Sequence, residues 1–333
     1  MKALVLRDYD RKPDSILLTE KPIPLLKPGE VLVQIAAASI NPSDLVFLQG
    51  QYGIVKPLPV VPGFEGSGRV VAAGGGFLAK MLLGKRVACH APDDGDGTWA
   101  EYMVTPADGC IPLFKQTTDE QGAALIVNPM TAWALVDLAK KGGHHAYVQT
   151  AAAGALGRMI ARLGRRRGLT GLHIVRRPEQ VAIMKAEGME RILDSSAPQF
   201  PEHLKEACQK FHPSIAFDAV GGAFTRQLAA AMPRGSRLVV YGALSGENCE
   251  LSPAHLVFRD QKLEGFWLTA WFKKKTLFQK LIFAYQVQRH LSEDLQTHVQ
   301  SRFPLEQFRE AIELYKKNRS EGKVLLIPTS GGR

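Results

Sequence analysis

The segment from Val148 to Gly157 carries the clearest chemical signal in the chain, with the sequence Val-Gln-Thr-Ala-Ala-Ala-Gly-Ala-Leu-Gly. A short apolar run precedes small residues, and Leu156, Met159, Ile160 and Leu163 then recur at helical spacing. The pattern predicts a strand, a tight turn and the start of a helix. Backbone N–H groups and the dipole at a helix N-terminus favour a phosphate group. The predicted phosphate contacts are Ala152, Gly154, Ala155, Leu156 and Gly157.

The glycine fingerprint of a dinucleotide fold is incomplete here, because Ala151 and Ala152 stand where a first glycine is expected. The turn alone therefore fits a buried structural helix as well as a nucleotide site. Arg176 and Arg177 follow the apolar run His173–Val175, about 20 residues after the turn. Dinucleotide folds place the residue that binds the ribose at this distance. Two guanidinium groups favour the 2′-phosphate of NADPH over the 2′-hydroxyl of NADH. The alternative is a solvated basic turn.

Further short apolar runs follow, and helix-compatible stretches separate most of them. Strands that alternate with helices are typical of a parallel sheet with helices on both faces. We therefore predict an α/β fold with a Rossmann-type, doubly wound parallel sheet. The predicted strands cover 191–194, 214–220, 237–241 and 262–267, and the predicted helices cover 178–187, 201–210 and 224–232.

The chain before Pro112 has a different pattern. Short runs rich in valine and isoleucine, such as Gly29–Ile35 and Gly68–Ala72, are separated by proline and glycine. Many short strands with turns between them favour a barrel-like β domain. The last predicted elements are helices near 278–285 and 304–314 and a terminal strand at 322–327, which could rejoin this first domain.

The composition limits the class of protein. With 333 residues, of which 45% are hydrophobic and 22% charged, the chain is large enough for two domains with buried cores. It contains no run long and apolar enough to span a bilayer, so we expect a cytoplasmic protein without membrane contact. The four cysteines are too far apart for a CxxC metal or redox motif.

The formal charge of +10 has two interpretations, attraction of nucleic acid or steering of phosphorylated cofactors and acyl carriers. The basic runs Arg165–Arg167 and Lys273–Lys275 supply much of the local excess, and neither belongs to an aromatic-interleaved basic motif. We therefore interpret both runs as solvated surface and expect no specific nucleic-acid partner.

Six ordered segments give the chain a family resemblance. Together with the phosphate turn, they are similar to the medium-chain dehydrogenase/reductases from Met1 to about Ile327. The resemblance implies a GroES-like β-barrel catalytic domain over residues 1–120, an NADPH-binding Rossmann domain over 121–267, and a return to the catalytic domain over 268–333. We also expect a homodimer. The segments are Ile40–Asp44, Pro62–Gly68, Gly84–Val87, Gly97–Tyr102, Asn128–Ala132 and Gly322–Val324.

The catalytic zinc ligands of the family are replaced in this chain. Its zinc alcohol dehydrogenases place a cysteine ligand where this chain has Asn41, and a histidine ligand where it has Phe64 beside Glu65. Asparagine is a poor zinc ligand and phenylalanine is none, so a tetrahedral site cannot be assembled. We therefore expect no metal, with Glu65 left from the zinc shell or serving as an ion-paired structural acid. Without a Lewis acid, the chemistry shifts to acceptors already activated by conjugation.

Two zinc-free subfamilies compete for the function, and Tyr52 is central to both. Resemblance to the enoyl thioester reductases of fatty acid synthesis assigns Tyr52 as the proton donor or carbonyl polariser, because a phenol can hydrogen-bond the developing enolate oxygen. NADPH quinone reductases also often carry a tyrosine there, packed on the cofactor, and need no acid. A third alternative is an NADPH-binding protein without turnover. The segments closest to enoyl reductases are Gln49–Gly53, Val127–Pro129, Val175–Pro178 and Gly265–Leu268.

The same resemblance assigns further cofactor contacts. It implies that Asn41 lies near the nicotinamide, Asn128 and Thr131 near the nicotinamide and its phosphates, and Lys323 on the pyrophosphate side. Each also has a structural interpretation. Asn41 and Asp44 could cap the helix that follows them, and Lys323 could be plain surface. The predicted wall of the nicotinamide pocket consists of Tyr241, Gly242, Ala243, Leu244, Phe266 and Trp267.

Overall fold

The computed structural model describes residues 1–9, 15–318 and 320–328. The chain falls into two units. Unit 1 contains Met1–Pro129 and Leu277–Arg333, and unit 2 contains Met130–Thr276. The sequence placed its two domain boundaries after residues 120 and 267, a few residues before each of these divisions.

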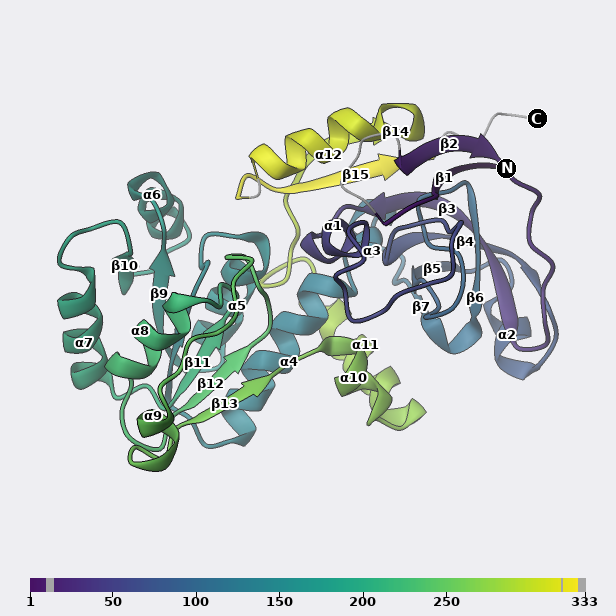
Figure 1. Ribbon diagram of the computed structural model, residues 1–333. Coiled ribbons are helices and arrows are strands. Elements are labelled where there is room, and N and C mark those ends of the chain that lie inside the picture. Colours follow the sequence, from purple (N-terminus) through teal and green to yellow (C-terminus); the bar gives the residue numbers. More distant parts are fainter. Residues whose placement is uncertain (10–14, 319, 329–333) are drawn as a thin grey trace. The chain divides into compact units, whose positions relative to one another are not determined.

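Unit 2 is built on a six-stranded parallel sheet with helices on both faces (Figure 1). The strand order is β10, β9, β8, β11, β12, β13. The chain first adds strands on one side of β8 and then on the other, so β8 and β11 flank the switch point of a doubly wound fold. This confirms the predicted Rossmann-type sheet. The strands are β8 (Ala146–Gln149), β9 (Thr170–Val175), β10 (Ile192–Asp194), β11 (Ile215–Asp218), β12 (Arg237–Val240) and β13 (Lys262–Gly265).

The helices of unit 2 form where an apolar stripe can face this sheet. In α5, Met159, Ile160 and Leu163 are buried, whereas Arg165 and Arg166 are exposed. The helices predicted at 178–187, 201–210 and 224–232 correspond to α6, α7 and α8. The bounds are α5 (Ala155–Arg166), α6 (Pro178–Ala186), α7 (Phe200–Phe211), α8 (Ala223–Ala231), α9 (Pro253–Val257) and α10 (Leu268–Lys273), and α4 (Val127–Lys141) begins in unit 1 and ends in unit 2.

Unit 1 contains the GroES-like β domain. Its main sheet has the strand order β14, β15, β3, β4, β5, β7, with β6 also paired to β3, and β1 and β2 form a separate antiparallel pair. The core includes the fully buried rings of Phe47 and Trp99. The strands before residue 130 are β1 (Lys2–Leu6), β2 (Ile16–Glu20), β3 (Glu30–Ser39), β4 (Glu65–Ala73), β5 (Arg86–His90), β6 (Tyr102–Pro106) and β7 (Cys110–Pro112), and the helices are α1 (Pro42–Phe47), α2 (Phe77–Leu82) and α3 (Asp119–Ala123).

The C-terminal segment of unit 1 begins with α11 (Leu277–Arg289) and ends with β15 (Lys323–Ile327). As predicted, the last strand rejoins the first domain, because β15 pairs with β3. Two details were missed. Strand β14 (Val299–Pro304) is half-exposed along its length and lacks a core strand's apolar pattern. The predicted helix at 304–314 begins later, as α12 (Phe308–Lys317), after a 3₁₀ turn.

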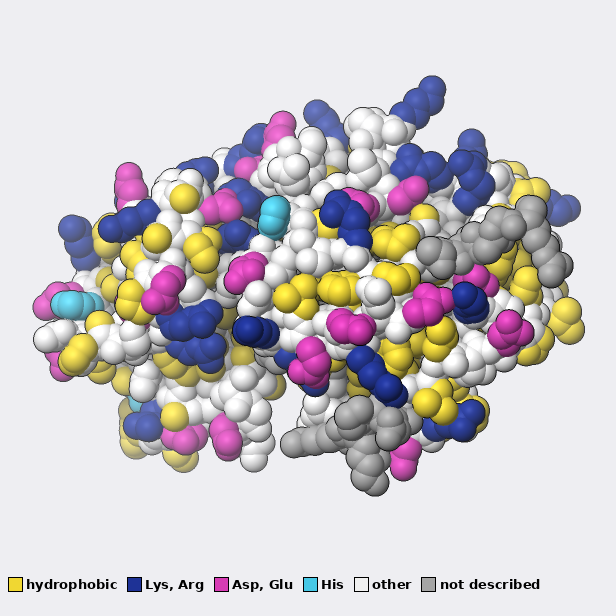
Figure 2. Space-filling model, turned by 90° about the horizontal axis from the view of Figure 1, so that it is seen from above, with side chains coloured by type: hydrophobic (Ala, Val, Ile, Leu, Met, Phe, Trp, Pro, Cys, Tyr) yellow, Lys and Arg dark blue, Asp and Glu magenta, His cyan; other side chains and the backbone are white. Residues whose placement is uncertain are grey.

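The surface of the protein carries charged side chains of both signs (Figure 2). On the face shown in Figure 2, Lys and Arg side chains are interspersed with Asp and Glu side chains. Within the described part of the chain, no helix has both the length and the apolar character needed to cross a membrane.

Candidate active site

A tight turn follows β8 at the switch point of the unit 2 sheet. The backbone N–H of Thr150 donates to Phe217 O of β11, and that of Ala152 donates to Ile174 O of β9, both at 3.0 Å. The turn is therefore fixed to both neighbouring strands. Gly154 is the N-cap residue of α5. The first N–H groups of a helix have no acceptor within the helix, so they are available to an anion here.

Two residues of this turn show why dinucleotide folds use glycine at such positions. Ala151 has a φ of 50°, in the left-handed region, which costs a residue with a Cβ about 1–2 kcal/mol. A Cβ added at Gly157 would lie 2.6 Å from the carbonyl oxygens of both Ala151 and Ala152. Glycine therefore allows α5 to approach the turn this closely. This cradle fits the pyrophosphate of a dinucleotide.

The predicted cofactor residues of unit 2 come together at one edge of its sheet. Arg176 and Arg177 directly follow the carboxyl end of β9, and both are exposed. The segment Tyr241–Leu244 follows β12, and Phe266 and Trp267 follow β13. Because all six strands are parallel, these ends share an edge with the phosphate turn. Unit 2 therefore groups the predicted phosphate, ribose and pocket-wall residues.

Asp218 is a residue at this edge that the sequence analysis did not single out. It ends β11, is fully buried, and accepts hydrogen bonds from Thr150 Oγ1 (3.1 Å) and Thr225 Oγ1 (2.8 Å). It also accepts the backbone N–H of Val220 (2.8 Å) and of Gly221 (3.2 Å). Asp218 therefore holds the loop after β11 against the phosphate turn. The sequence signal that could have identified Asp218 is an acidic residue at the carboxyl end of a predicted strand.

Asn128 and Thr131 lie one helical turn apart near the start of α4. Both side chains are nearly buried, with exposed fractions of 8% and 7%. Residues at i and i+3 share a helix face. The two predicted contacts are therefore presented on the same side of α4, and their roles toward a cofactor stay predictions.

Tyr52 lies in unit 1, in the loop after α1, and its side chain is half-buried. Its ring centroid is 4.7 Å from that of Phe64, whose ring in turn meets Phe47 edge-on at 5.4 Å. Phe64 occupies the position of a zinc-binding histidine in the zinc enzymes. The side chain there packs against Tyr52 instead of offering a ligand atom.

Asn41 belongs to a fully buried polar cluster in unit 1. Its side-chain Nδ2 donates to Glu65 Oε1 at 3.0 Å, and its Oδ1 accepts a hydrogen bond from Lys323 Nζ. The ammonium of Lys323 also lies 3.6 Å from Glu65 Oε1. Asn41 is 0% exposed and Lys323 is 2% exposed. Both residues thus have partners within unit 1, and these contacts favour structural roles over the predicted contacts with cofactor.

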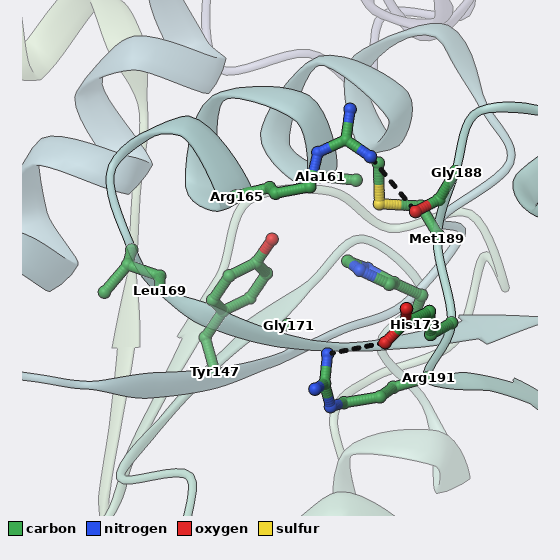
Figure 3. Close-up of a pocket in the computed structure, with 10 residues that line it drawn as sticks. Tyr147, Ala161, Arg165, Leu169, Gly171, His173, Gly188, Met189 and Arg191 are labelled. Carbon is green, nitrogen blue, oxygen red and sulfur yellow. Dashed lines mark hydrogen bonds and ion pairs between the residues drawn. The ribbon is translucent and has the colours of Figure 1, made fainter.

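A cavity of about 260 Å³ lies toward the amino ends of β8 and β9 in unit 2. Figure 3 shows Tyr147, Arg165, His173 and Arg191 around it. The phosphate turn follows the carboxyl end of β8, so this cavity belongs to the other end of the strands and is separate from the predicted cofactor residues.

The polar groups of this cavity already have partners in the protein. Tyr147 donates to Ile160 O at 3.2 Å, and Arg165 donates to Gly188 O at 3.0 Å. His173 Nδ1 lies 2.8 Å from the side-chain nitrogen of Gln149. Burial lowers the pKa of His173 to about 4, so its ring is neutral at physiological pH. We assign no ligand to this cavity.

Comparisons with known proteins agree with these two architectures. Residues 27–115 match the family "Alcohol dehydrogenase GroES-like domain", and residues 155–282 match the family "Zinc-binding dehydrogenase". A solved structure from Mesorhizobium loti, of a candidate NADPH:quinone reductase, is 35% identical with a TM-score of 0.92 and covers 98% of both chains. The chain belongs to the medium-chain dehydrogenase/reductase superfamily.

Two relatives in this superfamily are mitochondrial enoyl-[acyl-carrier-protein] reductases. The human protein is 28% identical over 98% of this chain and 88% of its own length, and a Caenorhabditis elegans protein is 31% identical over 84% and 83%. The quinone oxidoreductase of Thermus thermophilus, whose structures include a complex with NADPH, is 27% identical with a TM-score of 0.81, over 98% of this chain and 100% of that one. This medium-chain dehydrogenase/reductase is therefore an oxidoreductase that uses a nicotinamide cofactor.

Proposed function

We propose that the protein is an NADPH-dependent enoyl thioester reductase that needs no metal ion. The observation that carries the proposal is the placement of Tyr52. Its phenol ring packs on Phe64, at the position where zinc enzymes of the superfamily hold a metal ligand. The residue that packs beside the place of the lost Lewis acid therefore carries a phenol hydroxyl, a group that can donate a hydrogen bond. The enoyl reductases among the relatives support the choice of substrate.

The proposed chemistry assigns one task to Tyr52. The nicotinamide cofactor supplies a hydride when it is bound. As negative charge develops on the thioester carbonyl oxygen, the Tyr52 hydroxyl donates a hydrogen bond to that oxygen or a proton to the α-carbon. The turn from Thr150 to Gly157 holds the pyrophosphate, and the N–H groups of α5 offset its charge.

Reduction of a quinone is the second candidate function. It is supported by the solved structures from Mesorhizobium loti and Thermus thermophilus, one named as a candidate quinone reductase and one as a quinone oxidoreductase. A quinone accepts a hydride directly, and water can protonate its oxygen atoms. Tyr52 would then serve as a packing surface only.

Parallel assays of NADPH consumption test the proposed function. The acceptors are a crotonyl thioester, on coenzyme A and on an acyl carrier protein, a para-quinone, and no added acceptor. We expect turnover with the thioester, and turnover with the quinone alone would favour the second candidate. Binding of NADPH without consumption in any assay would favour a non-catalytic cofactor-binding protein.

Metal independence is supported by the contacts within the Asn41 cluster. Asn41 donates to Glu65 and accepts from Lys323, whose ammonium lies 3.6 Å from Glu65, so these side chains already bind one another and leave the ammonium where a zinc ion would sit. Another group of side chains that could bind a metal ion follows α11. It consists of His290, Glu293 and Asp294, whose possible ligand atoms lie within 4.8 Å of one another. We expect unchanged thioester turnover after chelation. Loss of activity together with loss of stoichiometric zinc would contradict this.

Preference for NADPH over NADH is expected from the two arginines after β9. Replacing Arg177 with alanine should weaken NADPH binding about 10- to 150-fold, because one charge-assisted hydrogen bond contributes roughly 1.5–3 kcal/mol. Binding of NADH should change little, as measured by fluorescence titration. Arg176→Ala should act in the same direction. Arg166→Ala, which removes the same charge from the end of α5, is the control, and an equal loss in that variant would contradict a specific contact.

We propose a homodimer because β13, among the described residues, is an edge strand of the unit 2 sheet. β13 pairs with β12 and is the last strand of the sheet, and its residue Leu263 is 37% exposed. Val257 and Phe258, at the end of α9, are 69% and 71% exposed. An exposed strand edge beside apolar side chains suits pairing with a second copy. The particle mass measured by light scattering should be twice that of the 36.5 kDa chain, and Leu263→Lys should lower it.

A further inference from the structure

A cluster of three acidic or basic side chains in unit 1 is almost completely removed from water. Asp44 and Glu65 are 0% exposed, and Lys323 is 2% exposed. They come from the first turn of α1, the start of β4 and the start of β15. Asn41, also 0% exposed, joins them through its side-chain amide. The cluster contains two carboxyl groups and one ammonium group, and the reaction proposed above gives it no part in the chemical step.

The two carboxyl groups accept backbone N–H groups near the starts of α1, β4 and α4. Asp44 accepts the N–H of Asn41 at 2.7 Å and that of Phe64 at 2.9 Å. Glu65 accepts the N–H groups of Ile126 at 3.0 Å and Val127 at 2.8 Å, at the start of α4. An ionised carboxylate only accepts hydrogen bonds, so both of its oxygen atoms can bind these N–H donors. A protonated carboxyl carries an O–H donor, which would face an N–H donor. Both segments are therefore held best when the acids are ionised.

Asp44 is connected to Tyr52 through a single residue. The backbone of Phe64 is held by Asp44 Oδ1, and the ring of Phe64 lies 4.7 Å from the ring of Tyr52. Phe47, from the last turn of the same helix as Asp44, also packs against Phe64, with a ring-centroid distance of 5.4 Å. A shift of the Phe64 backbone would therefore move the surface against which Tyr52 packs.

The protonation of Asp44 depends on the charges around it. Burial raises the pKa of Asp44 to about 7, while the N–H donors and the charge of Lys323 lower it. Glu65 acts in the raising direction, and Lys56 also interacts with Asp44 electrostatically. Burial lowers the pKa of Lys323, and both carboxylates oppose this. Removal of Lys323 would leave two adjacent buried acids, so Asp44 would hold its proton to higher pH.

We propose that Asp44 and Lys323 are positioning residues for Tyr52. Asp44 fixes Phe64, the residue against which Tyr52 packs, and Lys323 supplies the positive charge that keeps Asp44 an acceptor. The proposal rests on the role proposed for Tyr52 in thioester reduction. It concerns neither the cofactor turn of unit 2 nor the substrate directly.

The first test compares Lys323→Met with Lys323→Arg in the full-length protein. The Met variant should lose about 100-fold in kcat for a crotonyl thioester, because misplacement of a reacting group by about 1 Å costs that much. The Kd for NADPH should stay at the wild-type value. The acid limb of its pH–rate profile should move upward, because the charge of Lys323 lowers the pKa of Asp44 and its removal takes that effect away. The Arg variant keeps the charge and should recover the wild-type profile.

Hydrogen–deuterium exchange gives a readout that does not depend on the substrate. In Lys323→Met, the peptide covering residues 51–64 should exchange faster, and the peptide covering the phosphate turn should not. If the wild-type protein reduces no thioester, the proposed function fails while this measurement still decides the inference. Unchanged exchange in 51–64, or an unmoved pH profile, would overturn the positioning role.

Asp44→Asn keeps the proposal testable if Lys323→Met does not fold. This variant leaves one acid and one base in the cluster, Glu65 and Lys323, so the buried charges balance. Its amide NH₂ is a poorer partner for two N–H donors than a carboxylate. We expect faster exchange in 51–64 and a pH–rate profile without the limb that Asp44 titration produces. A wild-type kcat together with wild-type exchange would contradict the proposal.

Discussion

Replacing Gly157 with alanine is expected to weaken binding of the nicotinamide cofactor by about 5- to 150-fold. The added Cβ would lie 2.6 Å from the carbonyl oxygens of Ala151 and Ala152, and backbone atoms cannot move aside as a flexible side chain can. The turn and α5 must separate, which displaces the N–H groups that face the phosphate. Overpacking of this kind costs about 1–3 kcal/mol, or about 5- to 150-fold in affinity.

Gly265→Ala is the matched control for this variant. It makes the same substitution in unit 2, at the end of β13, where nothing lies within 4 Å of an added Cβ. Cofactor affinity measured by fluorescence titration should be close to the wild-type value in this control. An equal affinity in Gly157→Ala would show that the turn does not hold the cofactor, and a loss of the same size in both variants would point to general destabilisation.

The cofactor half of the site could be predicted because its signals are local in the sequence. Each signal depends only on the local backbone structure. The signals are the small residues of the turn, the apolar stripe of the helix, and two arginines about 20 residues after the turn. Even the departure at Ala151 is informative, since the structure gives this residue a φ of 50°, the conformation for which glycine is usual. The parallel sheet then brings the separate strand ends to one edge.

The polar cluster of unit 1 could not be predicted in the same way. Asn41, Glu65 and Lys323 are joined by hydrogen bonds and an ion pair across as many as 282 sequence positions. Composition and spacing do not reveal which lysine of many is buried. The sequence analysis therefore assigned Lys323 to the cofactor or the surface, whereas the structure places its ammonium among buried acids. Pairing of β15 with β3 brings the C-terminal segment to this site.

Strand β14 was not predicted for the same reason, because pairing between segments of the folded chain determines it. Its side chains are half-exposed, so no alternation of apolar and polar residues marks it. It forms because β15 offers a parallel edge, with Arg302 paired to Leu325 and Phe303 to Leu326. Tertiary pairing therefore decides its structure, and the helix predicted to begin at Pro304 begins only at Phe308.

Tyr52→Phe should lower kcat for an enoyl thioester by about two orders of magnitude or more. The substitution keeps the ring that packs against Phe64 and removes only the hydroxyl. Loss of one donor to a developing oxyanion typically costs roughly 2.7–4 kcal/mol in the barrier. The Kd for NADPH should change little, because the interaction is made in the transition state. Steady-state kinetics with a crotonyl thioester and fluorescence titration of NADPH provide the two measurements.

The same variant separates the two candidate functions, because a quinone does not need the hydroxyl. Its oxygen atoms are conjugated and can take protons from water, so quinone turnover should be nearly unchanged in Tyr52→Phe. Tyr102→Phe removes a phenol hydroxyl elsewhere in unit 1, near Gln34, and controls for general effects of the substitution. Thioester reduction at the wild-type rate in Tyr52→Phe would remove the proposed acid. If quinone turnover also exceeded thioester turnover, Tyr52 would be a packing residue and quinone reduction the better assignment.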